Sequence, residues 1–229
     1  MIIHLKKNIK ARQAETLAEQ HKAAFYQKED YYTLILSSGV KQLPDSLAEH
    51  ADTYCVLDSD IQLASRNYKE NTREVDLGAV KIGGATNNTV MITGPCSVES
   101  EEQINQSAGL CRELGVKILR AGSFKPRTSP YTFQGMGLEG LQLLAKIREQ
   151  YGLKIITEVR DASHVDQVID YADIVQIGAK AMYDHGILRK CGQANKPVLL
   201  KRGFGSTLQE FVQCAEFIMS GGNEQVVLC

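Results

Sequence analysis

The sequence has almost no net charge, no closely paired cysteines and no long apolar run. Its 229 residues carry a formal charge of -1 at pH 7, which excludes a general nucleic-acid or membrane-surface role because both need a broad excess of cations. No apolar stretch approaches the roughly 20 residues that span a bilayer, and the opening MIIHLKKNIK does not form a signal peptide. We therefore expect a soluble, cytoplasmic protein that binds neither nucleic acid nor membranes.

The six cysteines are irregularly spaced and include no C-x-x-C pair. This spacing argues against both a zinc knuckle and a redox dithiol, and it is typical of a protein from a reduced compartment. Hydrophobic residues make up 43% of the chain, enough to predict a buried core.

The first 66 residues predict a small α+β domain. Short strands are indicated at 1–7, 31–39 and 52–58, and helical spacing occupies 11–27 and 43–51. The polar, Gly- and Asn-rich residues 67–89 are expected to form a linker and a hairpin.

From residue 90 to residue 229, apolar strands alternate with amphipathic helices. Strands are expected at 90–96, 116–122, 154–159, 173–179, 197–203 and 225–229. Helices are expected between them, at 101–115, 138–152, 162–172, 183–193 and 207–222. This alternation predicts an α/β fold with a parallel sheet. A closed (β/α)8 TIM barrel needs eight strands, so the six indicated here predict a partial, truncated barrel.

Several cations fall at or just after the carboxyl ends of these strands. They are Arg120, Lys125, Arg127, Lys180, Lys201 and Arg202. Ligands of parallel α/β sheets bind at this edge, and Arg and Lys hold phosphates and carboxylates. A lone surface cation is usually solvated, but cations at several strand ends of a nearly neutral chain favour a substrate with more than one anionic group.

Other residues at the same edge also carry chemistry. Glu158 lies near the end of a strand, where a buried carboxylate is costly without a partner. It can orient a neighbouring cation or act as general acid or base, and the many cations nearby favour the orienting role. Thr128 can donate a hydroxyl to a phosphate or shape the adjoining turn. Cys96 suits zinc or ferrous iron, although a lone cysteine is more often a small buried hydrophobe. His164 and His185 fall within helical segments, so we exclude them as its metal-binding partners.

The strand-end motifs follow one another in a distinctive order: VDLGAVKIGG, GPCSVES, LRAGSFKPRTSPYTFQGMG, TEV, YADIVQIGA, NKPVLLKRGF and VVLC. In this order and spacing, residues 66–229 resemble the 3-deoxy-D-arabino-heptulosonate 7-phosphate (DAHP) synthase family. The resemblance is to the subfamily that carries a regulatory, ferredoxin-like N-terminal domain, which the first 66 residues resemble in element order.

The resemblance implies an enzyme that condenses phosphoenolpyruvate with D-erythrose 4-phosphate, releasing phosphate, at the entry to the shikimate pathway of aromatic amino-acid biosynthesis. It implies a divalent metal such as manganese, iron or zinc that activates the aldehyde. An aromatic amino-acid effector and a homo-oligomer of the complete chain are also expected.

Matching positions in the family's motifs imply the residue roles. Cys96 is expected to be a metal ligand, and Lys125 and Glu158 the catalytic residues. The expected ligands of phosphoenolpyruvate are Arg120, Lys125, Lys180 and Lys201, and those of the sugar phosphate are Arg127 and Thr128.

The sequence departs from the family pattern in two ways. Lys180 stands where the family usually has Arg, which keeps the charge but loses the bidentate geometry. The family's chain continues past VVLC with two more strands that carry its other metal ligands. We therefore expect the remaining ligands to lie outside these 229 residues, and this chain to be poorly stable or inactive alone.

Two alternatives stay open. 3-Deoxy-D-manno-octulosonate 8-phosphate synthase uses the same chemistry on arabinose 5-phosphate, but its family carries an Asn-rich sequence where this chain has KPRTS. A non-catalytic, truncated phosphosugar-binding protein is favoured by Lys180 and the missing strands, whereas the intact strand-end motifs favour an enzyme.

Overall fold

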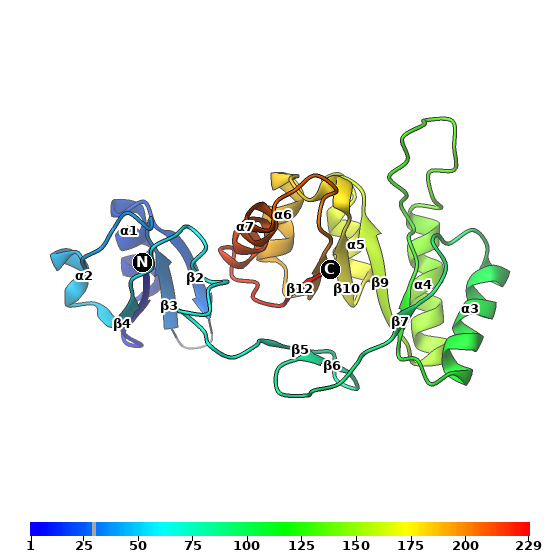
Figure 1. Cartoon of the computed structure of the whole chain (residues 1–229), viewed down its shortest axis with the longest axis horizontal. Helices are drawn as coiled ribbons and strands as arrows, with labels where there is room; N and C mark the ends of the chain where they lie inside the picture. The colour runs from blue at the N-terminus through cyan, green and yellow to red at the C-terminus, as the bar shows by residue number, and fades with distance from the viewer. Residues whose placement is uncertain (29–30) are drawn as a thin grey trace.

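The computed structural model describes residues 1–28 and 31–229, which form an N-terminal sheet, a small hairpin and a larger layered unit (Figure 1). The elements of the N-terminal part are β1 (Ile2–Leu5), α1 (Ala11–Gln20), β2 (Ala24–Lys28), β3 (Tyr31–Ile35), α2 (Asp45–Ala48) and β4 (Ala51–Cys55). The strands pair antiparallel in the order β2-β3-β1-β4. Leu17, Leu34 and Leu47 lie in the apolar core that the two helices make with one face of this sheet.

The helix expected over 11–27 is wrong in its second half, because α1 ends at Gln20 and β2 follows. Lys22 has a φ of 50°, a left-handed conformation that cannot continue a helix. Phe25 then packs toward the core of α1 and stacks on Tyr32 with ring centroids 5.5 Å apart, whereas Tyr26 is buried on the opposite face. This alternation has the period of a strand, and the helical spacing counted over 11–27 concealed it.

The larger unit is a parallel sheet with helices packed on its outer side. Its elements are β7 (Ile92–Thr93), α3 (Glu101–Glu113), β8 (Ile118–Arg120), α4 (Leu138–Tyr151), β9 (Lys154–Val159), α5 (Val165–Tyr171), β10 (Ile174–Ile177), η1 (Ala179–Ala181), α6 (His185–Gln193), β11 (Val198–Leu200), α7 (Leu208–Met219) and β12 (Val226–Leu228). The six strands lie side by side in chain order, which confirms the predicted α/β fold. The sheet curls into a half-barrel (Figure 1). None of the helices in the described ranges is long and apolar enough to cross a membrane.

Two apolar layers cover the two faces of the parallel sheet. On the outer face, residues such as Val175 and Leu200 pack against the helices. On the inner face, Ile156 and Leu199 pack beneath the hairpin of β5 (Glu74–Asp76) and β6 (Lys81–Gly83), which contributes Val75. The hairpin closes the amino-terminal end of the half-barrel, so the carboxyl ends of the strands lie at the opposite, open end (Figure 1).

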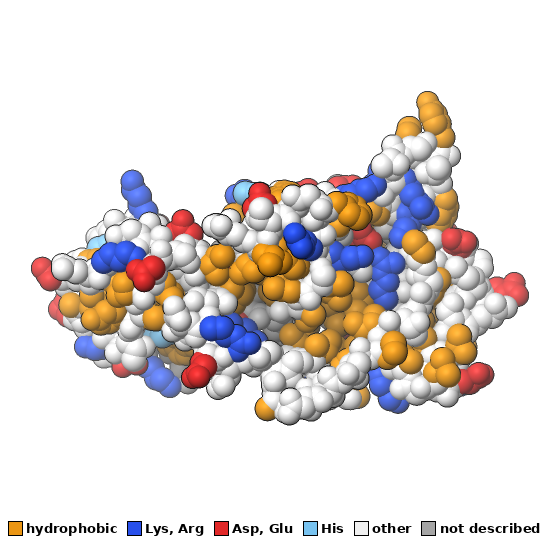
Figure 2. Space-filling model, viewed as in Figure 1, with side chains coloured by type: hydrophobic (Ala, Val, Ile, Leu, Met, Phe, Trp, Pro, Cys, Tyr) orange, Lys and Arg blue, Asp and Glu red, His pale blue; other side chains and the backbone are white. Residues whose placement is uncertain are grey.

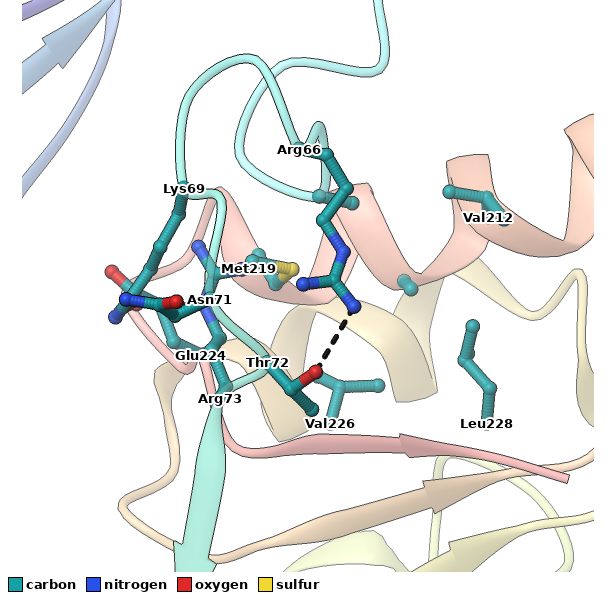
Figure 3. A pocket seen from close by; sticks show the side chains of 12 residues that line it. Arg66, Lys69, Asn71, Thr72, Arg73, Val212, Met219, Glu224, Val226 and Leu228 are labelled. Carbon is teal, nitrogen blue, oxygen red and sulfur yellow. Dashed lines mark hydrogen bonds and ion pairs between the residues drawn. The ribbon is translucent and has the colours of Figure 1, made fainter. Parts of the chain in front are cut away.

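The segment between the N-terminal sheet and the hairpin lies across α7 and β12 (Figure 3). Glu216, on α7 and 9% exposed, accepts the backbone N–H groups of Leu63 and Ala64, each at 2.8 Å. Burial raises the pKa of the Glu216 carboxyl. In the same segment, Arg66 donates to the Thr72 hydroxyl at 3.0 Å. The bonds of Glu216 attach the linker to the helix layer, and the bond between Arg66 and Thr72 stabilises the linker itself.

Glu224, in the loop after α7, connects the larger unit to the N-terminal sheet and to the linker. Its carboxylate lies 2.8 Å from Lys28 of β2, and 2.9 Å from Arg73 and 3.6 Å from Lys69, both in the linker. Burial alone would raise the pKa of Glu224, but the hydrogen bonds and charges of Lys28 and Arg73 outweigh it and lower the pKa to about 2.

We predict that these ion pairs make folding stability depend on acid. The pKa of Glu224 is lower in the folded chain than its ordinary value of 4.5, so its contribution is present above that value and is lost as pH falls from about 5 to about 2. Glu224→Gln should lower the free energy of unfolding by about 2 kcal/mol at pH 7 and by little at pH 2. Urea denaturation at several pH values measures this, with the exposed Glu113→Gln as the control; parallel pH profiles for wild type and Glu224→Gln would contradict it.

Candidate functional site at the carboxyl ends of the strands

The inner face of the half-barrel changes from apolar to polar toward the carboxyl ends of its strands. In each of three strands, an apolar residue of the inner layer is followed two positions later by a polar residue. The pairs are Ile118 and Arg120, Ile156 and Glu158, and Ile174 and Gln176. A spacing of two keeps side chains on the same face of a strand. The strands β8, β9 and β10 are hydrogen-bonded neighbours, so these three polar side chains meet above the apolar layer.

Arg120, Glu158 and Gln176 form a closed set of hydrogen bonds. Arg120 donates from Nη2 to Glu158 Oε2 at 2.8 Å and from Nε to Gln176 Oε1 at 2.9 Å, and Gln176 donates from Nε2 to Glu158 Oε2 at 2.9 Å. Glu158 and Gln176 are 8% and 3% exposed, so the carboxylate is partnered rather than solvated. Removing one member of such a buried pair typically costs about 3–5 kcal/mol.

Lys125 and Arg120 converge on the backbone of Cys96. The Cys96 carbonyl accepts from Lys125 Nζ at 2.8 Å and from Arg120 Nη1 at 2.9 Å. Lys125 is only 6% exposed, and its ammonium also lies 3.3 Å from the exposed Cys96 thiol. The hydrogen bond from Lys125, together with the charges of Lys125, Arg120 and Arg127, lowers the pKa of that thiol.

Arg127 and Lys180 lie at the loop between β8 and α4, which protrudes from the open end (Figure 1). Arg127 is exposed and donates to the Phe133 carbonyl at 3.2 Å, and Lys180 donates to the Pro126 carbonyl at 3.3 Å. Lys and Arg side chains gather at the base of this loop, above hydrophobic side chains of the sheet (Figure 2).

Like Arg127 and Lys180, three further predicted residues do not join the buried network. Within residues 1–28 and 31–229, the side chains of Thr128 and Lys201 have no hydrogen bond or ion pair. Arg202 donates to the Ser206 carbonyl and so stabilises its own loop. The structure therefore brings Cys96, Arg120, Lys125 and Glu158 together, and leaves the others at the rim.

Gln176 and Gly178 are parts of the site that the sequence did not single out. Gln176 is the polar residue within the apolar strand IVQI, a signal that pointed to a buried polar partner. Gly178 has φ −71° and ψ 160°, which any residue adopts, but a Cβ there would lie 2.0 Å from Glu158 Oε1. The absence of a side chain at 178 leaves the space for the Glu158 carboxylate.

Cys96 is the residue of this site best suited to hold a metal. Its thiol is exposed, and its lowered pKa favours the thiolate that binds soft or borderline divalent metals. The part of the chain that the structure describes contains no group of three or more His, Cys, Asp and Glu side chains that could hold a metal ion. Cys96 thus fits as a single donor.

Comparison with known sequences places most of the chain in one family. The DAHP synthetase I family matches residues 62–229. Phospho-2-dehydro-3-deoxyheptonate aldolase of Thermotoga maritima is 46% identical over 168 residues, which cover 73% of this chain and 49% of that protein. The chain thus spans about half the length of that relative. A 2-dehydro-3-deoxyphosphooctonate aldolase of Geobacter sulfurreducens is more distant, 30% identical over 164 residues that cover 69% of this chain and 60% of its own.

Solved structures show the same likeness. The crystal structure of the Thermotoga maritima aldolase, also called DAHP synthase, superposes with a TM-score of 0.71 at 36% identity and covers all of this chain and 68% of its own. A truncated form of 3-deoxy-D-arabino-heptulosonate 7-phosphate synthase from the same organism superposes with a TM-score of 0.67 at 40% identity, covering 75% of this chain and 61% of its own.

Gly178→Ala should displace the Glu158 carboxylate, because the new methyl group overlaps it. We expect a loss of about 1–3 kcal/mol in the free energy of unfolding, the usual cost of overpacking. Gly109→Ala is the matched control: it lies within α3 with open space around its Cβ, and should stabilise the chain by about 0.5–1 kcal/mol. Urea denaturation measures both, and a neutral Gly178→Ala would show that Glu158 has room to move.

Lys125→Met should raise the pKa of the Cys96 thiol, because it removes the hydrogen bond that favours the thiolate. The rate of alkylation of Cys96 by iodoacetamide, followed by mass spectrometry with a chelator present, should then rise at higher pH than in the wild type. The exposed Cys229 is an internal control whose alkylation profile should not change. Identical profiles for Cys96 in both proteins would contradict the assignment of Lys125 as its partner.

Proposed function

Because the chain belongs to the DAHP synthetase I family, we propose that it condenses phosphoenolpyruvate with D-erythrose 4-phosphate to form DAHP and inorganic phosphate. The observation that carries this proposal is the pair of mostly buried cations, Arg120 and Lys125, which meet at the Cys96 carbonyl where the strands end. Cations fixed in this way suit a small substrate with both a carboxylate and a phosphate.

Each part of the site has a proposed task. Arg120 and Lys125 bind phosphoenolpyruvate. Glu158 keeps Arg120 in place, and the Cys96 carbonyl accepts from both cations. Lys180 and Lys201, at the ends of the next strands, bind the same substrate from the other side of the open end. Arg127 and Thr128 are proposed to bind the phosphate of the sugar, since both are exposed on the protruding loop.

The reaction forms one carbon–carbon bond and one carbon–oxygen bond to water, and breaks the carbon–oxygen bond to phosphate. Carbon 3 of phosphoenolpyruvate attacks the aldehyde carbon, water adds at carbon 2, and the carbon–oxygen bond to phosphate breaks. The Lys125 ammonium, beside the Cys96 thiol, is placed to donate a proton to the aldehyde oxygen as it becomes an alcohol. The cations around the phosphate stabilise the leaving group.

A divalent metal belongs to this proposal, with Cys96 as one of its ligands. The exposed thiol and its lowered pKa support that role, whether the metal is manganese, iron or zinc. When bound, such a metal supplies Lewis-acid polarisation of the aldehyde.

The N-terminal sheet is proposed to be a ferredoxin-like regulatory domain over 1–66, followed by a linker and hairpin over 67–89 and by the catalytic unit over 90–229. Its chain order β1-α1-β2-β3-α2-β4 and its sheet order support the assignment. An aromatic amino-acid effector and a homo-oligomer are part of the same proposal. The cytoplasmic location stays a prediction.

The octulosonate reaction is less favoured, because the relative named for it is 30% identical against 46% for the heptonate aldolase. A non-catalytic phosphosugar-binding protein remains the alternative of a different class. It predicts binding of phosphoenolpyruvate without turnover.

Binding and turnover of phosphoenolpyruvate test the proposal. We predict that calorimetry with manganese present detects binding, and that Lys125→Met weakens it at least about tenfold, the value of a hydrogen bond to a charged group. Lys117→Met is the matched control. Lys117 directly precedes β8, at the amino-terminal end of the strand, whereas Lys125 follows its carboxyl end.

The choice of sugar distinguishes the candidates. Consumption of phosphoenolpyruvate with erythrose 4-phosphate, faster than with arabinose 5-phosphate, supports the proposal. Preference for arabinose 5-phosphate supports the octulosonate reaction. Binding without turnover of either sugar agrees both with the non-catalytic protein and with the expectation that these 229 residues are inactive alone. Equal binding by wild type and Lys125→Met would show that the site lies elsewhere.

A further inference from the structure

Gln176 is a buried amide with both of its polar ends in use. It lies on β10 among apolar neighbours and is 3% exposed. Burying an amide is costly unless each end has a partner. Here the carbonyl oxygen accepts from Arg120 Nε and the amide nitrogen donates to Glu158 Oε2, both at 2.9 Å.

These two bonds require a side chain at position 176 that both accepts and donates a hydrogen bond. A guanidinium only donates and an ionised carboxylate only accepts, so the bridging side chain must offer one acceptor and one donor. A hydrocarbon at 176 would leave Arg120 Nε and one Glu158 lone pair without this partner, and a second carboxylate would repel Glu158. The amide satisfies both without adding charge.

Gln176 also completes the fixation of the Arg120 guanidinium. Three of its five N–H donors are used within the protein, by Gln176 Oε1, Glu158 Oε2 and the Cys96 carbonyl. The other two, one on each terminal nitrogen, have no partner in the described residues. The guanidinium is thus held by three partners while its side chain stays 21% exposed, which leaves the two remaining donors for a ligand.

We propose that Gln176 is a positioning residue that locks the Arg120 guanidinium in the orientation in which its two free N–H donors bind the anionic group of the substrate. The identity of that anion as phosphoenolpyruvate rests on the proposed function. Locking the guanidinium before binding avoids the entropy cost of ordering it in the complex, so the gain appears as affinity.

Two measurements on the full chain test this inference. Calorimetry gives the affinity for phosphoenolpyruvate, and the ¹H–¹⁵N spectrum of arginine side chains reports the Nε–H of Arg120, assigned by its loss in Arg120→Lys. The variants are Gln176→Met, which keeps the volume without the amide, and Ile174→Val, a control in the apolar layer of the same strand.

We expect Gln176→Met to weaken binding about tenfold, to shift the Arg120 Nε–H signal and to speed its exchange with water. Ile174→Val should change neither quantity. If Gln176→Met does not fold, Gln176→Asn is the second variant: it adds no charge, but its amide is one methylene shorter, so the Arg120 Nε–H signal should shift as in Gln176→Met.

An unchanged Nε–H signal in Gln176→Met, or in Gln176→Asn where Gln176→Met does not fold, would overturn the inference. Wild-type affinity despite a shifted signal would overturn it too, because Arg120 would then bind the anion without being held. If the wild-type chain binds no phosphoenolpyruvate, the proposed substrate is wrong, and the Nε–H signal alone decides whether Gln176 holds Arg120.

Discussion

The ion pair between Arg120 and Glu158 joins the ends of two neighbouring strands and determines what the rest of the site can do. The carboxylate is mostly buried, and such a charge persists only where cations and donors surround it. Here it holds the guanidinium, and the Cys96 carbonyl then receives both Arg120 and Lys125. Glu158 therefore fixes Arg120, and the Cys96 carbonyl, which accepts from both cations, keeps Lys125 close to it.

The layered half-barrel supplies the rigidity that this arrangement needs. Helices pack against the outer face, and the hairpin of β5 and β6 closes the apolar layer on the inner face. Arg120, Glu158 and Gln176 lie two residues beyond this apolar layer on their strands, so the strands rather than a loop fix their positions. Arg127, by contrast, is exposed on the protruding loop between β8 and α4.

Much of this could be predicted from the sequence, because periodicity and strand ends are local signals. The alternation after residue 90 predicted six parallel strands, and the positions of Arg120, Lys125 and Glu158 at strand ends predicted that they would meet. The β2 strand was missed because its residues continued a helical spacing. The role of Gln176 depends on pairing between strands distant in sequence, and that of Gly178 on a steric contact, so neither had a local signal strong enough to reveal it. The structure brings Cys96, Arg120, Lys125 and Glu158 together, but their roles stay predictions, as do those of Arg127, Thr128, Lys180 and Lys201.

The central claim is that Arg120 and Lys125 are held ready for an anion before it binds. A crystal structure of the chain with phosphoenolpyruvate tests this most directly. The account predicts that an anionic group of the ligand lies within hydrogen-bonding distance of Arg120 and Lys125, while the bonds of Arg120 to Glu158 and Gln176 keep their lengths of 2.8 and 2.9 Å. A ligand bound away from these cations, or an Arg120 that leaves Glu158 to reach it, would contradict the account.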